Sequence, residues 1–122
     1  MGRILIVDDE VAIGQVLGAF FKRLGHHTTV VTSLSDAERE VMEKNFCLVI
    51  ADVFLGDGIS MDFIRHVKKS YESISLIAIS GCSQEKGEEV FRQAVEAGAD
   101  ATLSKPFTLK EIKEKVDEFC SA

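Results

Sequence analysis

Short apolar runs alternate with longer segments of helical periodicity along the whole chain. Five runs are predicted as strands because they are short and mostly rich in β-branched residues: 3–7, 28–31, 47–51, 74–79 and 101–103. Five segments are predicted as helices because their apolar residues recur at helical spacing: 11–24, 35–44, 61–69, 85–96 and 109–119. Strand and helix therefore alternate five times.

This repeated order decides the expected fold. A strand, a crossover helix and a parallel strand form a right-handed unit, which places helices on both faces of a sheet. We expect an α/β fold with a doubly wound five-stranded parallel sheet, order 2-1-3-4-5, and five helices on both faces. Residues 1–122 are expected to form a single domain, since this length matches one ordinary domain.

Capping boxes are predicted at the beginning of two helices. Ser35 with Glu38, and Thr108 with Glu111, follow the Ser/Thr-x-x-Glu pattern. In this pattern each side chain accepts a hydrogen bond from the backbone amide of the other residue. We therefore expect both helices to begin at these residues.

Composition argues against several classes of function. The net charge of −6 argues against sequence-independent binding of nucleic acid, which needs a basic surface. No apolar stretch approaches the roughly 20 residues that span a membrane, and the first residues lack the pattern of a signal peptide. We therefore expect a cytoplasmic protein whose domain contacts neither nucleic acid nor membrane directly.

Cysteine and histidine residues show no pattern of a metal site. The chain has three cysteines, Cys47, Cys82 and Cys120, and three histidines, His26, His27 and His66. The cysteines are odd in number and lack C-x-x-C spacing, so we expect reduced thiols and neither a disulfide framework nor a zinc site. The histidines do not cluster with acidic residues in the sequence and are expected at the surface.

Four predicted strands end at residues suited to phosphate chemistry, which are Asp8 and Asp9, Asp52, Ser80 and Lys105. In an open parallel sheet, ligands bind at the carboxyl ends of the strands, so we expect these residues to converge on one pocket. Carboxylates this close repel one another unless a cation neutralises them, and Mg²⁺ prefers oxygen ligands. The sequence therefore predicts a magnesium-dependent phosphoryl acceptor.

Asp52 is the candidate nucleophile. A carboxylate can attack phosphorus and form an acyl phosphate when cations stabilise the charge on the phosphoryl oxygens. Taken alone, Asp8 or Asp9 could cap the first helix and Asp52 could begin a turn. Capping does not explain an acid after the third strand, where no helix begins for several residues, whereas a shared cation does.

The pattern is similar to the receiver domain of two-component response regulators, as in the chemotaxis receivers, across essentially the whole chain. Five matches at the family's spacing carry this resemblance: Asp8, Asp9, Asp52, Ser80 and the pair Lys105-Pro106. The resemblance implies a flavodoxin-like fold. It also implies a signalling switch that catalyses only its own phosphorylation and dephosphorylation and is otherwise not an enzyme.

The resemblance further implies the ligands of a Mg²⁺ ion. Asp52 would be the phosphoacceptor and, with Asp9, a direct ligand of the metal. Asp8 would bind through water, and the backbone carbonyl of Phe54 would complete the protein ligands.

The resemblance also implies the remaining roles and the partners. Lys105 would pair with the phosphoryl group, and Ser80 would hydrogen-bond it and carry the switch. The donor would be a phosphohistidine on a sensor histidine kinase or a histidine phosphotransfer protein. Output would pass to a downstream protein or effector domain, and a homodimer could form through the face between Glu85 and Phe119.

Two positions depart from the family pattern. Gly56 stands where the family usually has proline, which predicts a more mobile loop. Thr102 stands where the family usually has an aromatic residue that turns inward behind the switch hydroxyl. We therefore expect output to be read through backbone shifts in residues 80–84 and the following helix.

The first helix contains Gly14 and Gly18, each less favourable than alanine by about 1 kcal/mol in a helix interior. One interpretation is close approach of a partner helix at a face that includes Val11 and Gln15 and resembles the family's kinase-docking face. The other is a tolerated pair of glycines.

Other functions fit the sequence less well. A phosphatase of the haloacid dehalogenase type needs a second acid where this chain has Phe54. A dinucleotide-binding loop would not carry the acids Asp8, Asp9 and Glu10 after the first strand. The remaining alternative is a receiver-like protein-binding module that is not phosphorylated. Only Gly56 and Thr102 support this alternative.

Overall fold

Five parallel strands form one sheet in the order β2-β1-β3-β6-β7 within residues 2–81 and 84–120, the part of the chain that this computed structural model describes. The strands are β1 (Arg3–Val7), β2 (His27–Val31), β3 (Leu48–Asp52), β6 (Ser75–Ser80) and β7 (Ala101–Ser104). The helices are α1 (Val11–Arg23), α2 (Leu34–Glu43), α3 (Met61–Ser70), α4 (Gln84–Ala97) and α5 (Leu109–Phe119), and none of them has the length and apolar character needed to cross a membrane. The predicted α/β fold and its strand order are confirmed.

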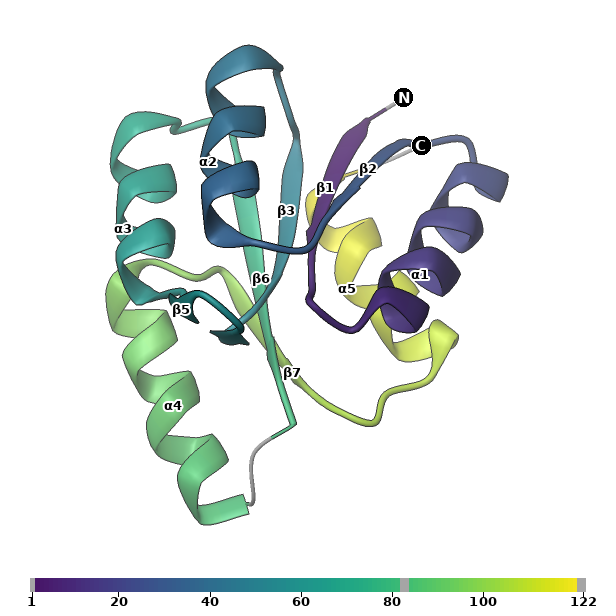
Figure 1. Ribbon diagram of the computed structural model, residues 1–122. Helices are drawn as coiled ribbons and strands as arrows, with labels where there is room; N and C mark the ends of the chain where they lie inside the picture. Colours follow the sequence, from purple (N-terminus) through teal and green to yellow (C-terminus); the bar gives the residue numbers. More distant parts are fainter. Residues whose placement is uncertain (1, 82–83, 121–122) are drawn as a thin grey trace.

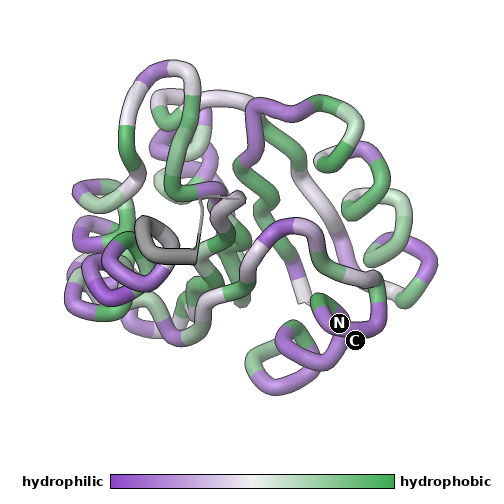
Figure 2. Tube along the Cα trace, turned by 90° about the horizontal axis from the view of Figure 1, so that it is seen from below, coloured by the Kyte–Doolittle hydropathy of each residue, from purple (hydrophilic) through white to green (hydrophobic). Residues whose placement is uncertain are grey.

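The sheet separates two layers of helices (Figure 1). α1 and α5 cover one face, and α2, α3 and α4 cover the other. Because side chains alternate along a strand, Ile4 and Ile6 of β1 pack with α1 and α5, whereas Leu5 and Val7 pack on the opposite side. All four are fully buried, and hydrophobic residues fill the inner strands in Figure 2. Burial on both faces explains the continuous apolar runs in the sequence.

The parallel register brings the ends of distant strands to one edge of the sheet. Asp52, the last residue of β3, lies beside Ile79 of β6, and Ser80 pairs with Ser104 of β7. β1 runs beside β3, with Val7 paired to Ala51. The residues that follow these strands are therefore neighbours, although they are far apart in sequence.

A small antiparallel hairpin follows β3 and was not predicted from the sequence. It consists of β4 (Phe54–Leu55) and β5 (Gly58–Ile59). Gly58 has a φ of 144°, which L side chains rarely adopt. Both carboxylate oxygens of Asp57 accept from the amide of Leu34 at 3.1 Å. The hairpin is thereby attached to the beginning of α2.

The beginning of α2 differs from the prediction. The capping box at Ser35 and Glu38 is wrong, because the helix begins at Leu34 and the side chain of Ser33 accepts from the Asp36 amide at 3.2 Å. The Asp57 carboxylate of the hairpin accepts from the Leu34 amide and so stabilises a helix that begins at Leu34. The capping box predicted for α5 is confirmed.

The two glycines of α1 serve contacts within the fold. Gly14 and Gly18 are buried, and a Cβ atom built on each would lie 2.6 Å and 3.0 Å from the Cγ1 and Cγ2 atoms of Val30. They therefore allow α1 to approach β2 closely. The interpretation that they admit a partner helix is wrong, although Val11 and Gln15 on the same helix are exposed.

A disulfide joins Cys47, just before β3, to Cys120 at the end of α5, with their Cα atoms 6.0 Å apart. The prediction of reduced thiols is therefore wrong for this pair, while Cys82 lies outside the described residues. The two cysteines are separated by 73 positions, so local spacing could not indicate that the fold brings them together.

His26 is buried, with 4% of its surface exposed, which corrects the prediction that all three histidines lie at the surface. Its amide donates to the carbonyl of Phe21 at 3.0 Å, and its ring lies against the Phe21 ring with centroids 5.9 Å apart. The turn after α1 therefore directs His26 inward. His27 and His66 are exposed, as predicted.

Candidate functional site

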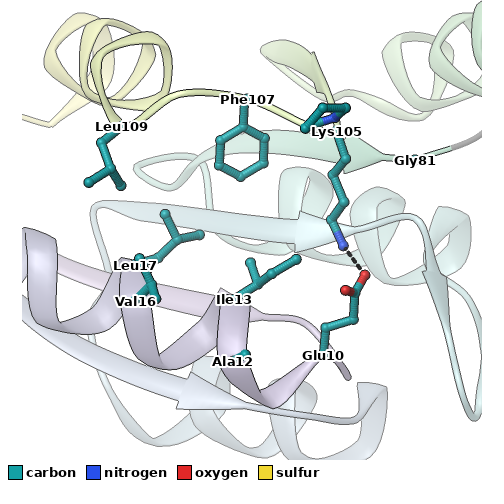
Figure 3. Close-up of a pocket in the computed structure, with 10 residues that line it drawn as sticks. Glu10, Ala12, Ile13, Val16, Leu17, Gly81, Lys105, Phe107 and Leu109 are labelled. Carbon is teal, nitrogen blue, oxygen red and sulfur yellow. Dashed lines mark hydrogen bonds and ion pairs between the residues drawn. The ribbon is translucent and has the colours of Figure 1, made fainter.

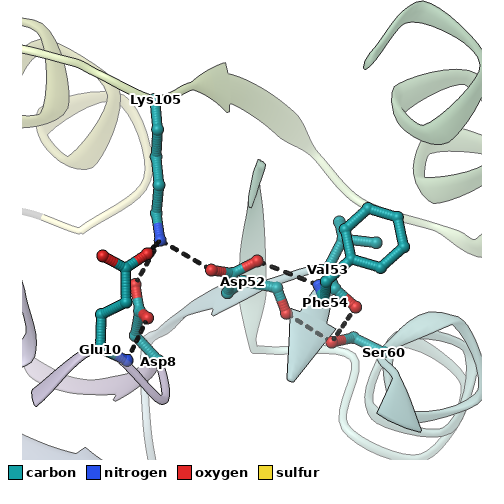
Figure 4. Close-up of polar contacts among 7 residues, drawn as sticks. All are labelled: Asp8, Glu10, Asp52, Val53, Phe54, Ser60 and Lys105. Atoms are coloured by element: carbon teal, nitrogen blue, oxygen red, sulfur yellow. Dashed lines mark hydrogen bonds and ion pairs between the residues drawn. The ribbon is translucent and has the colours of Figure 1, made fainter. Parts of the chain in front are cut away.

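Three of the predicted residues meet at the carboxyl edge of the sheet (Figure 4). The Nζ atom of Lys105 lies 3.0 Å from Asp8 Oδ2 and 2.7 Å from Asp52 Oδ2. Asp8 directly follows β1, Asp52 ends β3, and Lys105 directly follows β7. The site therefore combines residues from three strands and one ammonium group that bridges two carboxylates.

Glu10 is a fourth member that the sequence did not single out. Its Oε1 atom lies 2.8 Å from Lys105 Nζ, and its backbone amide donates to Asp8 Oδ1 at 2.9 Å. The only feature of the sequence that pointed to Glu10 was the run of three acids after β1, and only the first two of these acids match the family pattern. An exposed glutamate before a helix gives no sequence indication that it reaches a lysine 95 positions away.

Asp8 is the buried acid of the site. Burial raises the pKa of Asp8, and the nearby charge of Asp52 adds to this, whereas the Glu10 amide and Lys105 lower it and only partly offset the burial. Its Oδ2 atom is fully enclosed and accepts no well-aligned hydrogen bond from the described residues, although the lysine ammonium is near. Asp8 therefore directs a second oxygen, which is ion-paired with Lys105, into the site.

Asp52 is held at both carboxylate oxygens and is only 6% exposed. Oδ1 accepts from the backbone amide of Phe54 at 3.0 Å, and Oδ2 accepts from Lys105. The amide fixes the orientation of the carboxylate while the second oxygen faces the ammonium. This geometry presents an oriented carboxylate in the site.

A backbone hydrogen bond holds Lys105 beside the end of β6. Its amide donates to the carbonyl of Ser80 at 2.8 Å. The peptide bond to Pro106 is cis. Burial favours the neutral amine, but the hydrogen bonds to Asp52 and Glu10 and the nearby Asp8 carboxylate outweigh it and raise the pKa of Lys105 above its ordinary value. The lysine is therefore a permanent cation at neutral pH.

The other predicted site residues lie around this group. Ser80 is buried as the last residue of β6, and its carbonyl receives the Lys105 amide. Asp9 is exposed, and its Oδ2 atom lies 3.8 Å from a Cβ built on Gly56 in the hairpin. The side chain of Phe54 is 40% exposed beside Asp52.

Ser60 holds the backbone that carries Asp52, and the sequence analysis did not predict this role. This buried hydroxyl donates to the carbonyl of Asp52 at 2.5 Å and to that of Val53 at 3.1 Å. It stands before α3 but makes no side-chain capping bond to that helix. Its hydroxyl instead fixes the backbone at the end of β3. The sequence did not indicate this role, because a serine before a helix usually predicts only a helix cap.

The donor set suits a hard divalent cation. Carboxylate oxygens of Asp8, Glu10 and Asp52 all lie within 4.8 Å of one another. All are oxygen ligands of the kind that Mg²⁺ prefers, and the enclosed Oδ2 of Asp8 lacks an aligned donor. The residues therefore fit a Mg²⁺ ion, with Glu10 in the group where the sequence suggested Asp9.

An apolar pocket of about 690 Å³ adjoins the acidic group (Figure 3). It lies between α1 and the segment that joins β7 to α5, with Ile13 and Val16 on one side and Phe107 on the other. Glu10 and Lys105 belong to both the pocket and the charged site. A molecule that seats here would reach the carboxylates directly.

Residues 4–117 match the response regulator receiver domain family. The chain belongs to this family. It is 33% identical over 114 residues to the DNA-binding transcriptional regulator NtrC of Azospirillum brasilense, covering 93% of this chain and 23% of that protein. It is 31% identical over 116 residues to the KDP operon transcriptional regulatory protein KdpE of Escherichia coli K12, covering 95% of this chain and 50% of that one. The receiver-domain chain thus spans half or less of these relatives.

Solved receiver structures show the same fold. The beryllofluoride-activated NtrC4 receiver domain dimer is 29% identical with a TM-score of 0.85, covering 97% of this chain and 95% of that one. A CheY-like receiver domain protein from Methanospirillum hungatei is 27% identical with a TM-score of 0.85 and the same coverage. Receiver domains are signalling switches. The group of Asp8, Asp52 and Lys105 is therefore the candidate site of the switch.

Proposed function

We propose that this receiver domain accepts a phosphoryl group from a phosphohistidine partner onto Asp52 in the presence of Mg²⁺. The observation that carries the proposal is the position of Lys105 between Asp52 and Asp8. An ammonium held beside an oriented carboxylate can stabilise the negative charge of the phosphoryl oxygens during transfer. Asp8, Glu10 and Asp52 would hold the metal, which neutralises part of the same charge when bound.

The transfer needs few groups. An oxygen of Asp52 attacks phosphorus, an O–P bond forms as the N–P bond of phosphohistidine breaks, and the donor imidazole leaves with a proton from water. The Phe54 amide holds the attacking carboxylate, and Lys105 shifts its pairing from Asp52 to the transferred phosphoryl group. Ser80 then hydrogen-bonds this group, and a backbone shift that begins at the end of β6 carries the signal toward α4.

The apolar pocket supports the choice of donor. Its walls join α1 to the Lys105 segment, and Val16 of α1 is 55% exposed at this surface. A helix of a sensor kinase or of a histidine phosphotransfer protein that packs here would bring its histidine over the acidic group. Output would pass to a downstream protein or effector domain. A homodimer would form through the face between Glu85 and Phe119. Residues 1–122 would form a single receiver domain that works in the cytoplasm.

The test is the intact mass of the protein after incubation with acetyl phosphate, with and without Mg²⁺. We expect one phosphate adduct that depends on Mg²⁺ and disappears in Asp52→Asn. The matched control is Asp57→Asn, because Asp57 is an exposed acid of the same loop and the adduct should persist. A wild-type protein that gains no adduct despite binding Mg²⁺ would support the unphosphorylated protein-binding module instead.

A further inference from the structure

A second chemical group lies at the opposite edge of the sheet from Asp52. The Cys47–Cys120 disulfide joins the residue before β3 to the residue after α5. β3 ends at Asp52, so the bridge and the acidic group occupy the two ends of one strand. None of the receiver chemistry described above uses this edge.

The two sulfur atoms differ in access. Cys120 is only 5% exposed and belongs to the buried cluster of α1 and α5. Cys47 is partly exposed and lines a pocket of about 420 Å³ together with Arg3 and His27, whereas Cys120 does not line it. A small thiol can therefore approach Cys47 from solvent, and the Arg3 guanidinium favours an anionic one such as glutathione.

The bridge is closely packed and lies near an unsatisfied polar atom. Gly2 is buried against it, since a Cβ built there would collide with both sulfur atoms and lie 3.5 Å from Nδ1 of His26. That Nδ1 atom is enclosed and has no hydrogen-bond partner among the described residues. A neutral imidazole nitrogen can accept from a thiol, which the disulfide cannot supply. A cysteine thiol near Gly2 would offer this nitrogen a donor that the disulfide cannot supply.

We propose that Cys47 and Cys120 form a reversible dithiol–disulfide site that exchanges with a small anionic thiol of the glutathione type through the Cys47 pocket. A glutathione thiolate attacks Cys47 Sγ, the Cys47–Cys120 bond breaks, and Cys120 leaves as a thiolate that takes a proton from water. A second thiolate attacks the glutathione sulfur of the mixed disulfide and releases Cys47 with glutathione disulfide. The reverse sequence, with glutathione disulfide as oxidant, restores the bridge.

The consequence is a second input to the domain beyond phosphorylation. Oxidation fixes the last turn of α5 to the beginning of β3, whereas reduction releases that turn and leaves Ile112 and Val116 in the core. Disulfides of cytosolic proteins are rare and, when present, usually transient and redox-sensing. A reversible bridge therefore agrees with the compartment proposed for this protein.

The first test compares single-cysteine variants on a Cys82→Ser background, which removes the third thiol. Folded Cys120→Ser, which retains Cys47, and folded Cys47→Ser, which retains Cys120, are treated with glutathione disulfide and followed by intact mass. We expect Cys47 to form the mixed disulfide at least about tenfold faster, because burial hinders Cys120. The difference should vanish in guanidinium chloride. Equal rates in the folded proteins would overturn the proposal.

The second test keeps both cysteines and so does not depend on the single variants folding. The Cys82→Ser protein is equilibrated in buffers with different ratios of reduced to oxidised glutathione, and alkylation after denaturation counts the free thiols. We expect two thiols to appear and disappear reversibly while the protein stays folded, with a melting temperature about 10 °C higher in the oxidised form. A protein that forms no bridge in any ratio, or loses it only on unfolding, would overturn the proposal.

Discussion

The Nζ atom of Lys105 lies 2.7 Å from Asp52 Oδ2, although 53 positions separate the two residues. The same atom is within 3.0 Å of Asp8 and within 2.8 Å of Glu10. One ammonium therefore lies against three carboxylates and offsets part of the repulsion among them. A divalent cation would compete with Lys105 for the same oxygens, which links metal binding to the position of the lysine.

Removing the ammonium should reveal this competition. Lys105→Met leaves the three carboxylates without a counter-ion, so we expect a loss of about 2 kcal/mol in the free energy of unfolding without Mg²⁺. Mg²⁺ should raise the free energy of unfolding of the variant more than that of the wild type. The reason is that carboxylates without a neighbouring ammonium attract the metal more strongly. Urea denaturation at several Mg²⁺ concentrations measures both effects.

Lys113→Met is the matched control for that variant. Lys113 pairs with Asp117 at 2.6 Å on the surface of α5, where both side chains are about half exposed. Surface pairs contribute little, so we expect a change below about 0.5 kcal/mol and no dependence on Mg²⁺. If Mg²⁺ stabilised Lys105→Met less than the wild type, the proposed competition would be wrong.

The raised pKa of Asp8 predicts a pH dependence of stability in the metal-free protein. In the range from the ordinary value of 3.8 up to the raised pKa, the folded state binds more protons than the unfolded state. The contribution of Asp8 to the free energy of unfolding is therefore greatest below this range and is lost as pH rises through it.

Asp8→Asn cannot titrate and isolates this effect. We expect the stability of the wild type relative to Asp8→Asn to fall as pH increases from about 3.8 toward neutrality. Urea denaturation of both proteins across that range, without divalent metal, provides the measurement. A wild type that becomes relatively more stable as pH rises would contradict the raised pKa.

Ser60 should matter for both stability and phosphorylation. Ser60→Ala removes the donor to the carbonyls of Asp52 and Val53, and we expect a loss of about 1–2 kcal/mol in the free energy of unfolding. The looser backbone at the end of β3 should also slow adduct formation with acetyl phosphate. Ser70→Ala, at the exposed end of α3, should change neither quantity appreciably. Normal phosphorylation of folded Ser60→Ala would remove Ser60 from the positioning of Asp52.

Gly14 should resist substitution despite its place in a helix. Alanine is the better helix former by about 1 kcal/mol, but its Cβ would lie 2.6 Å from Val30 Cγ1, on a side chain with a stiff χ1. We expect Gly14→Ala to lower stability by about 1 kcal/mol and Gly14→Ala/Val30→Ala to recover it relative to Val30→Ala alone. Thermal unfolding of the four proteins tests this. A Gly14→Ala protein that melts higher than the wild type would refute the contact.

The sequence determined the order of the elements and the chemistry of one edge. Five apolar runs of strand length separated by amphipathic segments favour a doubly wound sheet, which buries both faces of its strands, so the fold followed from the pattern. Asp8, Asp52 and Lys105 were also found from their positions at strand ends, because parallel strands place those ends together. These signals are local or follow from a simple rule of topology.

The tertiary structure decided which distant residues meet. Glu10 reaches Lys105, Ser60 binds the backbone of Asp52, and Cys47 meets Cys120, although no spacing in the chain indicates any of these contacts. The inward position of His26, the earlier start of α2 and the Gly14 contact with Val30 have the same origin. Each depends on how one element packs on another, and this packing is fixed only when the burial of all the helices on the sheet is satisfied together.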